Sequence, residues 1–133
     1  MLIFCPDCWH ELKITPAKCP KCGAHVDFYS RDYERRLVSA LPHADAEMRA
    51  QICWTLGSRR KRSSVPVLTG LLRDPDVVVR VAALRGLGEI GDRSAASEVE
   101  KLIADQNTLV EAVARKVLQK LNSTTHPTHP HAA

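Results

Sequence analysis

Aromatic residues are scarce in this chain of 133 residues, and long hydrophobic runs are absent. Tryptophan, tyrosine and phenylalanine contribute two residues each, 5% together, so any core must be built from Leu, Val, Ala and Ile. Small aliphatic side chains suit closely packed helices better than a sheet sandwich. Because a membrane-spanning helix needs about 18 apolar residues or more, we expect no membrane partner.

The N-terminus lacks the pattern of an export signal. Its apolar start, Met1 to Phe4, is stopped at once by Cys5 and Pro6, and no basic leader precedes it. We therefore expect a cytoplasmic protein. The formal net charge of +4 is too small to indicate nucleic-acid binding by itself, and metal-bound thiolates would lower it further.

Four of the five cysteines fall into two close pairs. Cys5 and Cys8 form the first pair, Cys19 and Cys22 the second, and ten residues separate them. Two residues between cysteines allow both sulfurs of a tight turn to reach one ion, and zinc takes four such ligands in a tetrahedron. Without an export signal, the pattern favours metal over disulfides. We predict one structural zinc ion without an open coordination position, and we expect Cys53 to be a buried thiol.

Residues 3–26 resemble a short zinc ribbon, with the four paired cysteines as the matching ligands. Rubredoxin-like iron sites use similar turns much farther apart, so iron is the less favoured metal. One departure is Trp9, which stands where the ribbon family often has glycine. A segment of this size buries almost nothing without metal, so metal binding and folding should be one process. We predict that residues 1–28 cover the first helix pair through Phe4, Val26, Phe28 and Tyr29.

An internal repeat of 31 residues organises the middle of the chain. Apolar positions coincide in three copies without a gap, for example Leu41, Leu72 and Ile103. Each unit has the pattern of two antiparallel helices, which become stable by stacking on their neighbours. The expected repeat domain is 29–121, with units near 32–57, 64–91 and 94–121 and a disordered tail at 122–133. The expected helices are roughly Asp32–Ala40, Ala44–Leu56, Val65–Leu72, Val77–Ile90, Ala95–Ala104 and Asn107–Leu121.

The stretch from Asp74 to Asp92, DPDVVVRVAALRGLGEIGD, resembles the short HEAT repeat of phycobilisome-lyase-type proteins. The resemblance covers about residues 32–121. It implies a mainly α fold, a short right-handed α-solenoid of about three helix pairs. Such solenoids mostly act as protein-binding scaffolds, so the resemblance also implies a non-enzymatic adaptor that binds a protein partner. Three repeats can leave apolar ends that pair, so we expect a monomer or weak homodimer.

An enzyme, such as a chromophore lyase, is the minor alternative. Bilin-attaching relatives have many more repeats than three. Enzymes of the HEAT fold that carry a di-iron site use repeated His-Glu pairs, whereas this chain has one such pair, His10-Glu11, within the ribbon.

The helical repeats offer one candidate partner surface. Trp54, Arg85 and Lys116 share one repeat position, and three large, dissimilar side chains there indicate an exposed face of the second helices. Arg49 and Arg80 either join that face or form an Asp–Arg ladder between repeats, and we favour the ladder. Both are also four residues beyond an aspartate, which predicts ion pairs within one helix.

The main alternative to the adaptor is association with nucleic acid. It would use the basic ribbon together with Arg59, Arg60, Lys61 and Arg62 as phosphate contacts. A solvated loop at the negative end of a helix is the simpler interpretation of these four cations. Steep weakening by salt would distinguish phosphate binding from a protein interface.

Overall fold

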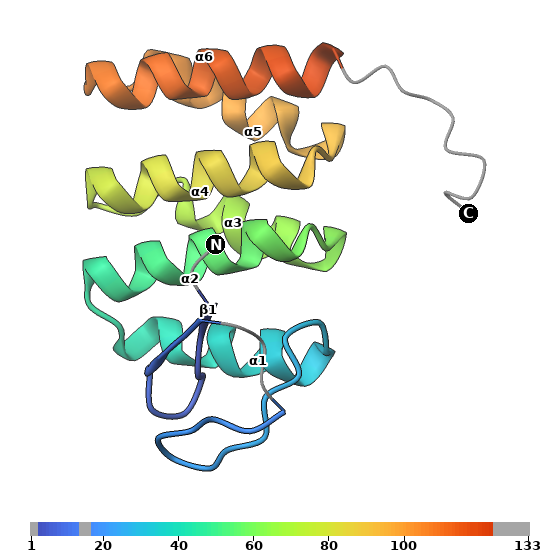
Figure 1. Ribbon diagram of the computed structural model, residues 1–133. Coiled ribbons are helices and arrows are strands. Elements are labelled where there is room, and N and C mark those ends of the chain that lie inside the picture. Colours follow the sequence, from blue (N-terminus) through green and yellow to red (C-terminus); the bar gives the residue numbers. More distant parts are fainter. Residues whose placement is uncertain (1–2, 14–16, 124–133) are drawn as a thin grey trace, which may run out of the picture.

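The computed structural model describes residues 3–13 and 17–123. In these residues, six α-helices stack in tiers, and a small ribbon with two short strands lies at the beginning of the stack (Figure 1). The second helix of each pair is the longer one. The element bounds are β1 Ile3–Phe4, β2 Glu11–Leu12, α1 Arg31–Ala40, α2 Ala46–Arg59, α3 Val65–Leu71, α4 Val77–Ile90, α5 Ala96–Lys101 and α6 Thr108–Ser123, with 3₁₀ turns at Leu41–His43, Arg62–Ser64, Arg93–Ala95 and Leu102–Ala104.

The six expected helices are present, and the differences lie at their ends. The helix α2 continues beyond Leu56 to Arg59, and Arg60 ends it in the left-handed conformation with φ 53°. The helix α6 continues to Ser123, so the first two residues of the predicted disordered tail are helical. The rest of that tail lies outside the described residues. Among the described residues, no helix is both long and apolar enough to span a membrane.

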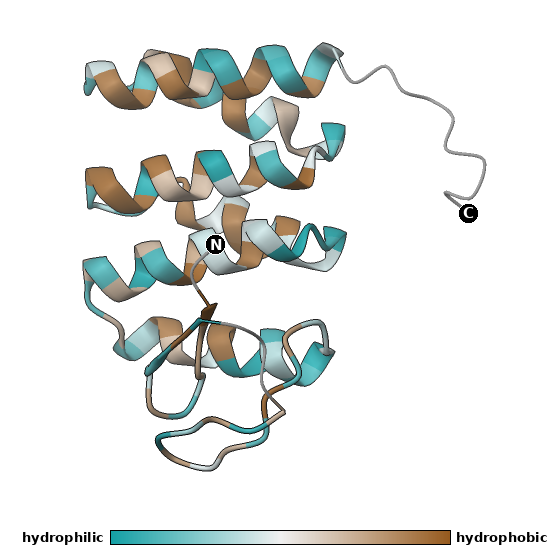
Figure 2. Cartoon of the chain, viewed as in Figure 1, coloured by the Kyte–Doolittle hydropathy of each residue, from teal (hydrophilic) through white to brown (hydrophobic). Residues whose placement is uncertain are grey.

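Side-chain caps start the longer helices α1, α2 and α4, whereas α3 and α5 follow 3₁₀ turns and have no side-chain cap. Apolar and polar segments alternate along each helix (Figure 2). Ser30 begins α1 by accepting from the Tyr33 N–H at 3.0 Å, and Asp45 begins α2 by accepting from the Met48 N–H at 2.8 Å. These caps satisfy N–H groups that have no partner within the helix.

The helices α2 and α4 touch backbone to backbone. A Cβ atom added to Gly57 would lie 2.5 Å from the Gly86 Cα, and one added to Gly86 would lie 3.1 Å from the Cys53 carbonyl oxygen. Glycine at both positions is therefore what allows the crossing. The buried Ala82 and Ala83 also lie on α4, as expected for small residues where helices pack closely.

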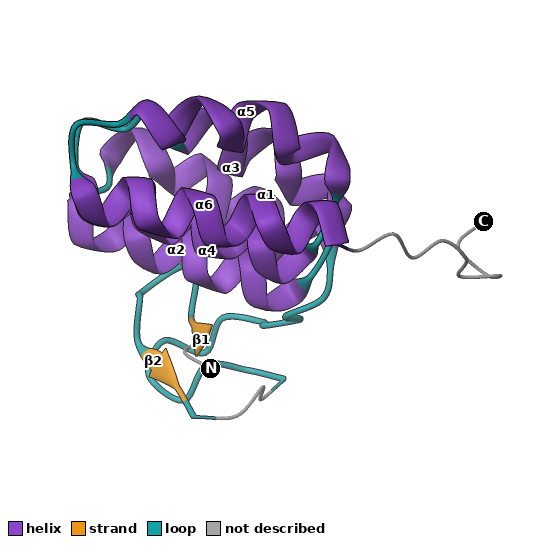
Figure 3. Ribbon diagram, turned by 90° about the horizontal axis from the view of Figure 1, so that it is seen from above, coloured by secondary structure: helices purple, strands orange, loops and turns teal. Residues whose placement is uncertain are grey.

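The ribbon packs against the helices and shares their core. Its strands lie to one side of the stack, away from α5 (Figure 3). Phe4, Val26 and Phe28 are buried as predicted. The Tyr33 hydroxyl on α1 donates to the Phe4 carbonyl at 2.7 Å, which fastens the first strand to the solenoid. The prediction for Tyr29 is wrong, because 59% of its surface is exposed, although its ring makes an edge-on contact with the buried Phe28.

Candidate metal centre and partner surface

The two cysteine pairs lie in turns of the same form. The Trp9 N–H donates to the Cys5 carbonyl at 2.8 Å, and the Gly23 N–H donates to the Cys19 carbonyl at 2.9 Å. The backbone of both donating residues has the left-handed conformation, with φ 61° at Trp9 and 76° at Gly23. Glycine adopts this conformation without strain, so Trp9 occupies a position that favours glycine. Its ring packs beside Phe4, with centroids 6.4 Å apart.

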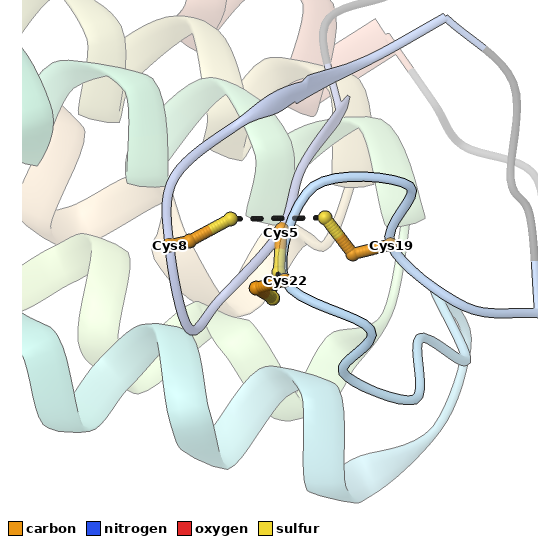
Figure 4. Close-up of side chains that lie close together, drawn as sticks. All are labelled: Cys5, Cys8, Cys19 and Cys22. Atoms are coloured by element: carbon orange, nitrogen blue, oxygen red, sulfur yellow. Dashed lines mark hydrogen bonds between the residues drawn. The ribbon is translucent and has the colours of Figure 1, made fainter.

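The four sulfurs of these turns converge on one point (Figure 4). Cys5 Sγ lies 3.6 Å from Cys22 Sγ, and Cys8 Sγ lies 3.7 Å from Cys19 Sγ. All four lie within 4.8 Å of one another and are free thiols. A tetrahedral ion with bonds of about 2.3 Å to sulfur places its ligands about 3.8 Å apart, whereas a disulfide needs about 2.05 Å. The cluster therefore has the geometry of a four-thiolate metal site.

The surroundings of the cluster act on its ionisation in opposite directions. Burial and the neighbouring thiols raise the pKa of Cys5. At Cys19, burial also acts to raise the pKa, but hydrogen bonds from the Cys22 and Lys21 N–H groups and from the other thiols lower it to about 7. The Lys21 N–H lies 3.4 Å from Cys19 Sγ. Thiols this close resist ionising together without a cation, and a divalent ion held by the four cysteines would supply the missing charge.

Arg59 is buried between the ribbon and the solenoid. Its guanidinium donates to the Phe28 carbonyl at 2.7 Å, to the Ser30 carbonyl at 2.9 Å and to Glu34 at 3.1 Å. The Glu34 carboxylate also accepts from the hydroxyls of Ser63 and Ser64. Arg59 is thus removed from the predicted phosphate contacts, because its charge is already neutralised in the interior.

The other three predicted phosphate contacts lie on the surface. Arg60 lies 3.2 Å from Glu89 and Arg62 lies 3.8 Å from Asp92. Lys61 lies over the exposed ring of Tyr29, with its ammonium nitrogen 6.0 Å from the centroid. Two of the three cations are therefore already paired with carboxylates.

Arg49 and Arg80 form rungs between successive units, so their assignment to a partner surface is corrected. Arg49 donates to the Asp74 carboxylate at 2.8 and 3.1 Å. Arg80 lies 3.3 Å from Asp105 and donates to the Asp74 carbonyl at 2.9 Å. The predicted pairs within one helix are wrong, because the aspartates four residues earlier cap α2 and α4 instead. Their carboxylates accept N–H groups of those helices, and the arginines extend to the next unit.

Trp54, Arg85 and Lys116 are exposed on α2, α4 and α6, and they line two adjoining hollows. The first, about 480 Å³, has Trp54, Arg85 and Gly86 among its lining residues. The second, about 380 Å³, runs from Arg85 to Lys116 and Lys120. Because Arg85 lines both hollows, the side chains at this one repeat position, Trp54, Arg85 and Lys116, form a continuous surface across the three helices.

Sequence reasoning missed two features of this arrangement. One is the Gly57–Gly86 contact, since the repeat aligns Gly57 with Gly88; only the spatial offset between helices brings Gly86 opposite. The other is the burial of Glu34, which resembles a solvent-facing residue of an amphipathic helix. The serines at 63 and 64 follow a cationic run in the sequence, and no spacing pattern connects them with Glu34.

The comparisons with known proteins identify the helical part. A family model described as HEAT repeats matches residues 34–119. The chain belongs to the HEAT-repeat family. The match is to HEAT repeats in general, and the resemblance to the phycobilisome-lyase type stays a prediction. Among curated proteins, no match to the chain was found.

One solved structure similar to this HEAT-repeat chain is human deoxyhypusine hydroxylase in complex with glycerol. The TM-score is 0.66 at 20% sequence identity, and the match covers 71% of this chain and 34% of that chain. At this identity the likeness concerns the fold alone. The HEAT-repeat chain spans about a third of the enzyme's length, and the four-cysteine cluster adds a candidate metal site to its helical repeats.

Proposed function

We propose that this chain is a non-enzymatic adaptor that binds a protein partner on the exposed face of its second helices and is braced by one structural zinc ion. The face formed by Trp54, Arg85 and Lys116 is the observation that carries the proposal. It is hollowed, half apolar, and built on three helices that the Arg49–Asp74 rung helps to hold together. Such stacked repeats present broad surfaces that suit a macromolecule.

Zinc fits the ribbon as a structural ion. Four thiolates fill a tetrahedral coordination shell and leave no position for a substrate or an activated water. We assign Cys5, Cys8, Cys19 and Cys22 as its ligands. The remaining thiol, Cys53, is fully buried, and burial raises its pKa to about 12. A thiol of this kind is a poor nucleophile at neutral pH, which also supports a role other than catalysis.

The test is affinity capture from the source cells, with the zinc-loaded chain as bait. We expect one protein to be captured in stoichiometric amount, and to be lost with the variants Trp54→Ala and Lys116→Ala. Arg93→Ala, an exposed cation outside the hollows, serves as the matched control and should retain the partner. A partner retained by all variants, or turnover of a substrate by the purified chain, would overturn the proposal.

Nucleic-acid association is the second candidate function. The exposed Tyr29 ring beside Lys61 favours it, because an aromatic face next to a cation can stack on an unpaired base. The ion pairs of Arg60 and Arg62 count against it. Binding of a single-stranded oligonucleotide that weakens steeply with salt and is lost in Tyr29→Ala would support this candidate; salt-independent or Tyr29-independent binding would exclude it.

A further inference from the structure

Two glycines of α4 are among the residues that line the hollows on the second-helix face. Gly86 lies in the first hollow, directly at the contact with α2. Gly88 lies in the second, and a Cβ there would come 3.4 Å from Val117 on α6. We call the two adjoining hollows, which share Arg85 and Glu89, the trough.

The trough is strongly biased toward positive charge. Its two hollows are lined by four basic side chains and a single acidic one, Glu89, which Arg60 binds at 3.2 Å. Arg85 and Lys116 are exposed and form no ion pair within the part of the chain that the structure describes, in contrast to Arg49 and Arg80 of the ladder. Unpaired cations that flank a hollow select a negatively charged occupant.

One end of the trough, at Trp54 in the first hollow, is apolar. Trp54 exposes 43% of its surface at the edge of the first hollow, and a half-exposed tryptophan is the type of side chain that anchors protein interfaces. A nucleic acid gains affinity from many phosphate contacts along its backbone, and two unpaired cations supply few. Together, the apolar and basic ends favour a peptide that carries both an apolar side chain and carboxylates.

We propose that the trough binds an extended acidic segment of the partner protein, lying across α2, α4 and α6. An apolar side chain packs on Trp54, one carboxylate pairs with Arg85 and a second pairs with Lys116. Neighbouring helix axes are roughly 8–10 Å apart, and an extended chain advances about 3.3 Å per residue. The anchors are therefore about three residues apart, apolar then acidic then acidic. This inference rests on the proposed adaptor function and names the chemistry of its partner.

The test uses the zinc-loaded full chain and two synthetic fluorescent peptides. One carries leucine, glutamate and glutamate at the spacing above in a Gly/Ser background, and the other contains the same residues scrambled. We expect the first to bind at least about tenfold more tightly, and Arg85→Glu and Lys116→Glu each to weaken it by about tenfold or more. Arg93→Glu, an equal charge change on the exposed surface, should change binding less than about twofold.

A charge swap keeps the test independent of folding defects. Lysine in place of the second peptide glutamate should restore binding to Lys116→Glu and not to Arg85→Glu. Equal binding of both peptides, or equal weakening by Arg93→Glu, would overturn the inference. So would competition by a single-stranded oligonucleotide, or a dimer that Arg85→Glu dissociates, because the occupant would then be a nucleic acid or a second copy. If the peptides fail while capture of the natural partner still needs Trp54, the adaptor function stands and the acidic segment does not.

Discussion

The ribbon and the solenoid hold their shapes by different means. In the ribbon, two strands of two residues each and a few buried side chains surround the four cysteines. In the solenoid, α2 and α4 touch at Gly57 and Gly86, and charged rungs tie each unit to the next. The ribbon should therefore depend on an ion, and the solenoid on close packing. The buried Arg59 joins the two parts.

Metal removal should separate the two parts most clearly. Structural zinc supplies about 10–16 kcal/mol of apparent binding free energy to small sites, so the ribbon should unfold when the ion is removed. We expect a strong chelator to remove amide hydrogen-exchange protection from residues 17–28 while α4 and α6 stay protected. The double variant Cys5→Ser/Cys22→Ser should give the same pattern. Protection that persists in the ribbon after chelation would mean that its few apolar contacts suffice.

Arg59→Met should weaken the connection between ribbon and solenoid. The substitution leaves Glu34 buried without its charged partner, and breaking such a buried pair costs about 3–5 kcal/mol. Urea unfolding should show the loss. Arg60→Met, one residue later on the surface, is the matched control and should change stability little. Equal effects of the two variants would show that the buried network contributes nothing beyond surface charge.

The helix crossing should tolerate no side chain. A methyl group at Gly57 meets the Gly86 backbone, so Gly57→Ala must push α2 and α4 apart, at a cost of about 1–3 kcal/mol. Gly70→Ala is the control, since nothing lies within 4 Å of its added Cβ. Within α3 it should stabilise by about 0.4–1 kcal/mol through a less flexible unfolded chain. Thermal unfolding that shifts in the same direction for both variants would contradict the close contact.

Acid should weaken the rung at Asp74, the smallest effect that we predict. Burial acts to raise the pKa of Asp74, but hydrogen bonds from Arg49 and from the Asp76 N–H outweigh it and hold the pKa below its ordinary value. A lowered folded pKa contributes stability above the unfolded pKa of about 3.9, and this stability is lost as pH falls through the folded value. Urea unfolding of wild type and Asp74→Asn should therefore differ at pH 6 and converge toward pH 2. If the difference in unfolding free energy between wild type and Asp74→Asn did not change with pH, ionisation of the Asp74 carboxylate would not be its cause.

The sequence was sufficient to predict the parts of the molecule that are marked by a repeat or by a regular spacing of residues. The spacing of the cysteines predicted a cluster that the structure confirms, and the 31-residue period predicted the stacked helices. The ladder was anticipated, but its aspartates were misassigned, because a helix cap and a rung have the same local sequence pattern. Glu34 and Arg59 could not be assigned from sequence, since the equivalent positions of the next unit hold Val65 and Ile90, and the pair therefore has no counterpart in the repeat.

Metal content tests the central claim most directly. Elemental analysis of the chain purified without added metal should find one zinc per chain, and none in Cys5→Ser/Cys22→Ser. A chain that contains no metal, or one whose cysteines are joined in disulfides by intact mass, would contradict the account of the ribbon.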